Sequence, residues 1–268
     1  MDSDSDPYNV NQERPTWLDL YDWRRRIASI YRQRELELQA GINEVTVWQR
    51  FRARKDALLA HHPQSPLSPD ARRHFTGLNY FPYNPDLRLE AVLEPVLEPE
   101  GAEDTQDSKD SEDTEHIGAT APLHAGSSHA LPLRRAAQLI ITLEGISLRL
   151  IVYWIDVYGG GLFLPFRDAT CPEESYGGGR YLCDTVKGSD LLWLHDETGP
   201  PTETEDPAEN YKGIGPRLGF GLGRRVALDF NYAYNPSCTY DPRWVCPLAP
   251  KENWLPVSIR AGERNFRM

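Results

Sequence analysis

Two stretches of the chain combine glycine, arginine, asparagine and aromatic residues in a way that suggests a binding site. The first covers 165–182 and contains three consecutive glycines, Gly177 to Gly179, directly before Arg180. Glycines permit positive φ angles and close backbone approach, and successive N–H groups in such a turn can bind an anion. The guanidinium groups of Arg167 and Arg180 would add planar, two-pronged donors for a carboxylate or a phosphate.

The same stretch fits a purely structural role. A triple glycine is also suited to a tight turn between strands, with Arg167 and Arg180 paired internally to Asp168, Asp184 or Asp229. A P-loop is excluded, because neither a helical pattern nor a Lys-Ser/Thr pair follows the glycines. An anion site and a satisfied turn therefore both remain compatible with these residues.

The second stretch covers 228–263 and opens with Asp229 and Asn231, which the alternation of a strand would place on one face. An aspartate near arginine and tyrosine side chains could act as a general base, and the same polar pair could instead satisfy a turn. Candidate ligand-binding residues from both stretches are Arg167, Asp168, Tyr176, Gly177, Gly178, Gly179, Arg180, Tyr181, Asp229, Asn231, Tyr234 and Asn235.

Cys238 and Cys246 lie within the second stretch, with seven residues between them. A metal site would need two further ligands, usually as close Cys or His pairs, and no histidine lies at pair spacing to either cysteine. We therefore predict no metal, and these residues identify no cofactor. Buried structural thiols are the expectation, while a disulfide and a reactive thiol remain alternatives.

The two stretches resemble an uncharacterised prokaryotic family catalogued as domain of unknown function 1684. The resemblance rests on the motifs PFRD and YGGGRYL in the first stretch and DFN, AYNPSC, CPLAPKEN and AGE in the second. It covers about 48–263 apart from two inserts, and departs from the family pattern at Ser237, Ala249 and Trp254. The resemblance implies a compact domain with a shared site, and it supplies no reaction.

The net charge of −11 is concentrated outside these stretches. Ten acidic residues against one lysine lie in 94–118, and six acidic residues without a base lie in 196–209. Without these segments and the acidic tip at Asp2, Asp4 and Asp6, the chain carries a net charge of +7. The remaining positive charge favours an anionic small molecule over a basic partner.

Helices are expected in the N-terminal part, where apolar residues recur at three- and four-residue spacings. They are predicted over 15–41 with Thr16 as N-cap, over about 43–61, and over 68–75 with Ser68 as N-cap.

From residue 87 the period changes to two, which predicts strands. The segments 138–143 and 147–154 flank a short turn that contains Gly145, which is typical of a hairpin. No helical pattern separates the strands, so antiparallel pairing is expected. Further strands are predicted at 87–93, 161–166, 180–184, 225–230 and 256–259.

The sequence thus predicts an α+β fold in which an N-terminal helical segment, 1–86, packs on an antiparallel β-barrel or β-sandwich, 87–268. Acidic, disordered inserts are expected at about 94–130 and 196–212, because these segments cannot bury enough apolar surface to fold. We find no nucleic-acid-binding motif and no apolar run of about 18 residues, and the acidic, polar residues 1–7 lack the basic start and the apolar stretch expected of a secretory signal. Neither a nucleic acid nor a membrane is therefore an expected partner, and a cytoplasmic location is expected.

Our leading functional hypothesis is a β domain that binds an anionic or polar small molecule, either as a pure binding domain or as an enzyme whose reaction these residues do not define. A second hypothesis is a structural or protein-interaction module whose polar motifs form an internal hydrogen-bond network. A third is a thiol or metal site at Cys238 and Cys246.

Overall fold

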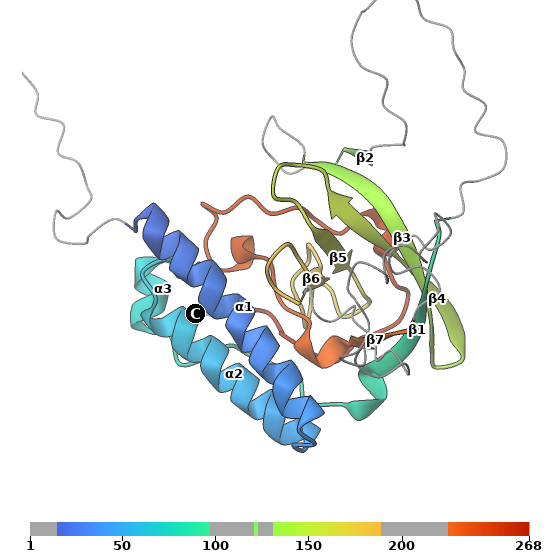
Figure 1. Ribbon diagram of the computed structural model, residues 1–268, viewed down its shortest axis with the longest axis horizontal. Coiled ribbons are helices and arrows are strands. Elements are labelled where there is room, and N and C mark those ends of the chain that lie inside the picture. Colours follow the sequence, from blue (N-terminus) through green and yellow to red (C-terminus); the bar gives the residue numbers. More distant parts are fainter. Residues whose placement is uncertain (1–14, 97–120, 123–130, 189–224, 268) are drawn as a thin grey trace, which may run out of the picture.

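The computed structural model describes residues 15–96, 121–122, 131–188 and 225–267. In these residues, helices lie against one side of a strongly curled antiparallel sheet (Figure 1). The predicted α+β fold is confirmed, and the sheet takes the form of a half-barrel. The acidic insert predicted at 196–212 lies outside the described residues, as does most of the insert predicted at 94–130.

The three predicted helices form, and two of them begin at the predicted N-caps, Thr16 and Ser68. Thr16 and Asp19 form a capping box, in which each side chain accepts a hydrogen bond from the main-chain N–H of the other residue. Asn43 and Ser68 cap the next two helices in the usual one-sided way. No helix in the described part of the chain has the length and apolar character needed to cross a bilayer. The helices are α1 (Trp17–Gln39), α2 (Glu44–His61) and α3 (Pro69–Arg73).

The strands pair in the order β6-β5-β4-β3-β1-β7, and every neighbouring pair is antiparallel. The predicted hairpin is confirmed: its turn residues, Glu144 and Gly145, have φ angles of 53° and 77°. The short strand β2 pairs with β3. The strands are β1 (Arg88–Glu94), β2 (Ala121–Pro122), β3 (Pro132–Leu143), β4 (Ile146–Ile155), β5 (Leu162–Phe166), β6 (Arg180–Cys183) and β7 (Arg225–Asp229).

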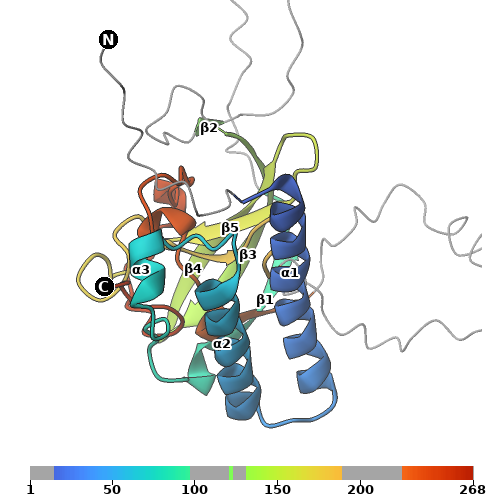
Figure 2. The same cartoon turned by 90° about the vertical axis from the view of Figure 1, so that its left-hand side faces the viewer.

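Both faces of the central strands are buried. Along β4, Leu150 and Val152 belong to the core enclosed by the curled sheet, whereas Ile151 and Tyr153 pack with residues of α1 and α2. Figure 2 shows α1 and α2 side by side across this outer face. The alternation of side chains along a strand thus supplies two apolar layers from one sequence segment.

The two ends of the sheet path meet at one pair of residues. The main-chain N–H of Tyr181, in β6, donates to the carbonyl of Tyr234 at 2.9 Å, and the N–H of Tyr234 donates back at 3.0 Å. Tyr234 follows β7 after a short 3-10 helix, η3 (Phe230–Tyr232). This bridge brings the first and the second polar stretch together.

The strand predicted at 256–259 does not form. The chain bends at Pro256 and Val257. Alternate side chains from Leu255 onward fill the core, but the main-chain hydrogen bonds between this segment and residues 167–169 amount to an isolated bridge and not to a strand. Pro256 has no N–H to donate. The N–H of Ile259 donates to the Asp168 carboxylate at 2.7 Å instead of to a main-chain carbonyl, so a ladder cannot continue.

Two glycines have the same φ angle, but we expect their substitution to reduce the free energy of unfolding by very different amounts. Gly262 and Gly41 both have φ of +74°, but a Cβ on Gly262 would lie 2.5 Å from the carbonyl oxygen of Ala233, whereas Gly41 has no atom within 4 Å. We expect Gly262→Ala to lower the free energy of unfolding by about 3 kcal/mol or more, from strain plus collision. Gly41→Ala should cost only about 1 kcal/mol. Urea unfolding followed by circular dichroism measures both, and equal losses would contradict this account.

Candidate functional site

Arg180 is completely buried and bound by protein groups. Its Nη1 donates to the carbonyls of Ala261 and Glu263, the latter at 3.1 Å. Its Nη2 donates to Asp168 Oδ1 at 3.0 Å and to the carbonyl of Ile259 at 2.8 Å. The guanidinium therefore binds the C-terminal segment of the domain and does not face a cavity.

Asp168 completes this buried cluster. Its Oδ1 pairs with Arg180, and its Oδ2 accepts hydrogen bonds from the N–H groups of Thr170 and Ile259, at 3.2 and 2.7 Å. A buried charge pair is tolerable only when its remaining hydrogen-bonding capacity is met, and here main-chain groups meet much of it. The PFRD and YGGGRYL motifs are thus joined through one ion pair.

The three glycines form a tight turn in which the carbonyl of Tyr176 accepts from the N–H of Gly179 at 2.9 Å. A Cβ on Gly178 would lie 2.6 Å from the ring of Tyr176, so the ring packs where a side chain would otherwise stand. Arg167 closes the turn from outside: its Nε donates to the carbonyl of Gly177 at 3.0 Å, and its guanidinium lies 4.5 Å from the ring centroid of Trp254.

Asp229 and Asn231 do not share a strand face as predicted, because β7 ends at Asp229 and the chain turns into η3. Asp229 Oδ1 accepts from the N–H and the Nδ2 of Asn231, at 3.0 and 2.9 Å. The side chain of Asn231 also exchanges two hydrogen bonds of 2.8 Å with the main chain of Asn84. Burial raises the pKa of Asp229, and the hydrogen bonds from Asn231 lower it in part. Both side chains therefore have internal partners.

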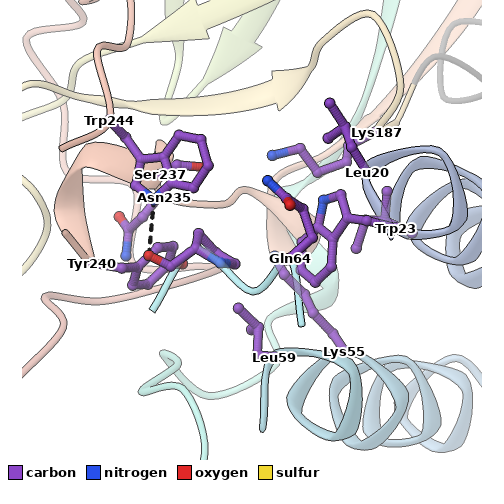
Figure 3. A pocket seen from close by; sticks show the side chains of 12 residues that line it. Leu20, Trp23, Lys55, Leu59, Gln64, Lys187, Asn235, Ser237, Tyr240 and Trp244 are labelled. Atoms are coloured by element: carbon purple, nitrogen blue, oxygen red, sulfur yellow. Dashed lines mark hydrogen bonds between the residues drawn. The ribbon is translucent and has the colours of Figure 1, made fainter. Parts of the chain in front are cut away.

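A cavity of about 120 Å³ lies between α1, α2 and the loop that follows Tyr234 (Figure 3). Trp23, Lys55, Lys187, Asn235 and Trp244 are among the residues that line it.

A second hollow of about 280 Å³ adjoins this cavity, because Trp23, Lys187 and Ser237 line both. It extends to Tyr181 and Cys246. Of the residues predicted for ligand binding, Asn235 lines the cavity and Tyr181 lines the hollow. Neither lining includes Arg167, Arg180 or Asp229 among the described residues.

Lys55 and Glu263 form a buried ion pair at the cavity wall, with Nζ and Oε1 2.5 Å apart. The Glu263 carboxylate also accepts from the hydroxyls of Tyr80 and Tyr240, at 3.2 and 2.7 Å, and from the N–H of Asn235 at 2.8 Å. Burial lowers the pKa of Lys55, the Glu263 charge opposes this, and the positive charge of Lys187 lowers that pKa further.

Lys187 approaches the cavity from the other side. Its Nζ lies 3.1 Å from Asp184 Oδ2 and 4.3 Å from the ring centroid of Tyr234. Lys55 Nζ lies 5.0 Å from the same centroid, so one aromatic ring contacts both ammonium groups. Burial opposes ionisation of Asp184, but the Lys187 charge and two main-chain hydrogen bonds hold the pKa of Asp184 below its usual value.

Asn235, which lines the cavity, has one acceptor that no described residue satisfies. Its Nδ2 donates to the carbonyl of Arg264 at 2.8 Å, which sets the orientation of the amide. Its Oδ1 is buried and has no hydrogen-bond partner among the described residues. Buried acceptors of this kind are uncommon in proteins, and a bound donor would satisfy this one.

The sequence analysis does not single out Lys55, Lys187 or Trp23 as site residues. Helical spacing alone cannot identify a buried lysine, because its burial depends on the distant Glu263. One signal was available, namely that lysine is rare in a chain whose cations are mostly arginine.

Cys238 and Cys246 are free thiols, as are the two other cysteines. Within the described residues, no three His, Cys, Asp or Glu side chains are grouped as a metal ion would require. The structure therefore gives no support to the metal alternative.

Fold and cavity together define an α+β domain with a half-barrel covered by helices. The sequence model of the family described as "Protein of unknown function (DUF1684)" matches residues 73–199 and 206–264. The chain belongs to this family, which confirms the resemblance seen in its motifs. No curated protein matches the chain. An uncharacterized protein of Haloarcula marismortui, solved by solution NMR, is 26% identical, with 93% of this chain and 97% of that chain covered and a TM-score of 0.47.

The buried ion pair between Arg180 and Asp168 predicts how the replacement of Arg180 changes stability. We expect Arg180→Met to lower the free energy of unfolding by about 3–5 kcal/mol, because Asp168 then stays buried without a counter-charge. The matched control is Arg167→Met, which removes one side-chain hydrogen bond and a stacking contact and should cost about 1 kcal/mol. Urea unfolding measures both variants. If Arg180→Met were as stable as the control, the pair would not have the structural role described.

Proposed function

We propose that this domain binds a small molecule with an anionic group in the cavity between α1, α2 and the loop after Tyr234. The observation that carries the proposal is the approach of two ammonium groups, Lys55 and Lys187, to one cavity and one aromatic ring. A carboxylate or a phosphate is the ligand group that two ammonium groups recognise.

The electrostatics of the cavity support an anionic ligand. Each lysine has one carboxylate partner: Glu263 pairs with Lys55 and Asp184 pairs with Lys187. The charges of these four groups therefore sum to zero. An ammonium group has three N–H donors, and each ion pair uses one of them. The two lysines also repel one another, as the effect of Lys187 on the pKa of Lys55 indicates. A bound anion would reduce this repulsion and use the remaining donors.

Other lining residues narrow the class of ligand. The Oδ1 of Asn235 favours a ligand that also carries a hydroxyl or an amine as hydrogen-bond donor. Trp23 and Trp244 supply apolar walls, and the indole of Trp244 is held by a hydrogen bond of 3.0 Å to the carbonyl of Pro66. The space of about 120 Å³ favours a molecule of few non-hydrogen atoms, such as a small hydroxy acid.

This proposal keeps the predicted ligand class and assigns it to a different set of side chains. Asn235 remains in the proposed site and Tyr181 lines the adjoining hollow. Arg180, Asp168 and Asn231 instead have internal partners that suit a structural network. That network holds the C-terminal segment, including Glu263, in the position from which it reaches Lys55.

Thermal unfolding of the full chain with small hydroxy acids, keto acids and inorganic phosphate tests the proposal. A ligand present at 100 times its Kd should stabilise the wild type by about 2.7 kcal/mol. We expect Lys187→Met to weaken binding at least tenfold, because one ammonium group is lost from the site. Lys251→Met is the matched control, since Lys251 is exposed and lies outside the lining. Equal stabilisation of both variants would contradict the proposed site.

Tryptophan fluorescence gives a second, independent measurement. Trp23 lines the cavity, whereas Trp17, on the same helix, is 86% exposed. A ligand in the cavity should change the fluorescence of the wild type and of Trp17→Ala by a similar amount. Trp23→Ala should lose a large part of that change and bind more weakly. A ligand signal that survives in Trp23→Ala and disappears in Trp17→Ala would place the ligand elsewhere.

A further inference from the structure

Two of the four cysteines face each other across a loop. The main-chain N–H of Cys238 donates to Cys246 Sγ at 3.3 Å, and the hydroxyl of Tyr176 lies 3.5 Å from Cys238 Sγ. Both cysteines are half-buried. Cys171 and Cys183 are buried, with exposed fractions of 8% and 1%, so solvent reaches the facing pair more readily.

The loop is held in this shape by contacts that do not involve the thiols. A 3-10 helix, η4 (Ser237–Thr239), begins it, and the N–H of Trp244 donates to the carbonyl of Asp241 at 3.2 Å. The side chain of Arg243 contacts the carbonyl of Ser65 at 3.3 Å. The approach of Cys246 Sγ to the main chain of Cys238 is therefore set by the fold.

The environments of the two thiols differ. A hydrogen bond from Cys246 lowers the pKa of Cys238 to about 6, with a smaller contribution from the hydroxyl of Tyr176. The same contact between the cysteines raises the pKa of Cys246. Of the two sulfurs, Cys238 is therefore the one that loses its proton more readily.

We propose that Cys238 and Cys246 are a redox-active dithiol that a hydroperoxide oxidises to a disulfide. The Cys238 thiolate attacks one peroxide oxygen, the O–O bond breaks, and the leaving oxygen takes up a proton to depart as water or an alcohol. Cys238 is then a sulfenic acid. The sulfur of Cys246 forms the S–S bond, its proton leaves with the hydroxyl as water, and two electrons have passed to the peroxide. A dithiol reductant then reduces the protein disulfide to two thiols and is itself oxidised to a disulfide.

Access to the pair is available from the larger hollow. Cys246 lines this hollow, as do Ser237, the neighbour of Cys238, and Pro247. The inference does not depend on the proposed anionic ligand, because it rests on the thiols and on Tyr176 alone.

Hydrogen peroxide treatment of the reduced, full-length protein tests the inference. We expect two of the four thiols to be lost and to return after dithiothreitol. Trypsin cleaves after Arg243 and so separates the two cysteines, which makes a 238–246 disulfide visible as two linked peptides by mass spectrometry. Cys246→Ser should stop at a sulfenic acid on Cys238 that dimedone captures, and Cys238→Ser should slow oxidation at least tenfold. Thiols that stay reduced, or oxidation without linked peptides, would overturn the inference.

The pH dependence of alkylation tests the role of Tyr176 as a positioning residue. Iodoacetamide reacts with the thiolate, so the rate at Cys238 should rise with pH and reach half its maximum near pH 6. Tyr176→Phe should shift this midpoint upward by about half a pH unit or more, because a donor to the thiolate is lost. Tyr158→Phe, at a fully exposed position, should leave the midpoint unchanged. A midpoint near 8.5 in the wild type would overturn the assignment of Cys238 as the thiolate.

Discussion

The buried ion pair between Arg180 and Asp168 is the interaction on which the rest of the domain depends. Burying two charges is costly, and the cost is offset here because main-chain groups bind both partners. Those main-chain groups belong to the C-terminal segment, which has no ladder of its own to hold it in the half-barrel. The ion pair therefore holds this segment in place, as strand pairing holds the strands of the sheet.

Through Glu263, the ion pair is also connected to the helices on the other side of the sheet. Arg180 binds the carbonyl of Glu263, and the side chain of the same residue binds Lys55 of α2 and the hydroxyl of Tyr240. A single residue thus links the core of the half-barrel, the helices and the loop that lines the cavity. The residues of the polar motifs build the wall of the cavity, while lysines from outside those motifs supply the charge that faces it.

The thiol pair and the cavity share one loop. Residues 238–246 carry both sulfur atoms and also Tyr240 and Trp244, which line the cavity. A covalent bond between Cys238 and Cys246 would limit the movement of those two side chains, since the nine-residue segment 238–246 would be closed into a ring. The physical link between the two proposals is therefore this loop, although each is tested separately.

The sequence by itself determined the elements that depend on contacts within a few residues. The capping box at Thr16, the turn at Glu144-Gly145 and the alternation along β4 all follow from local geometry, and all three are found. Tertiary structure alone decided the rest. Lys55 and Glu263 are 208 residues apart, and burial of a lysine follows from that distant partner. Distant partners also fix the roles of Arg180, Asp229 and the 256–259 segment. A buried polar group needs a hydrogen-bond partner close to it in space, whatever the distance of that partner along the chain.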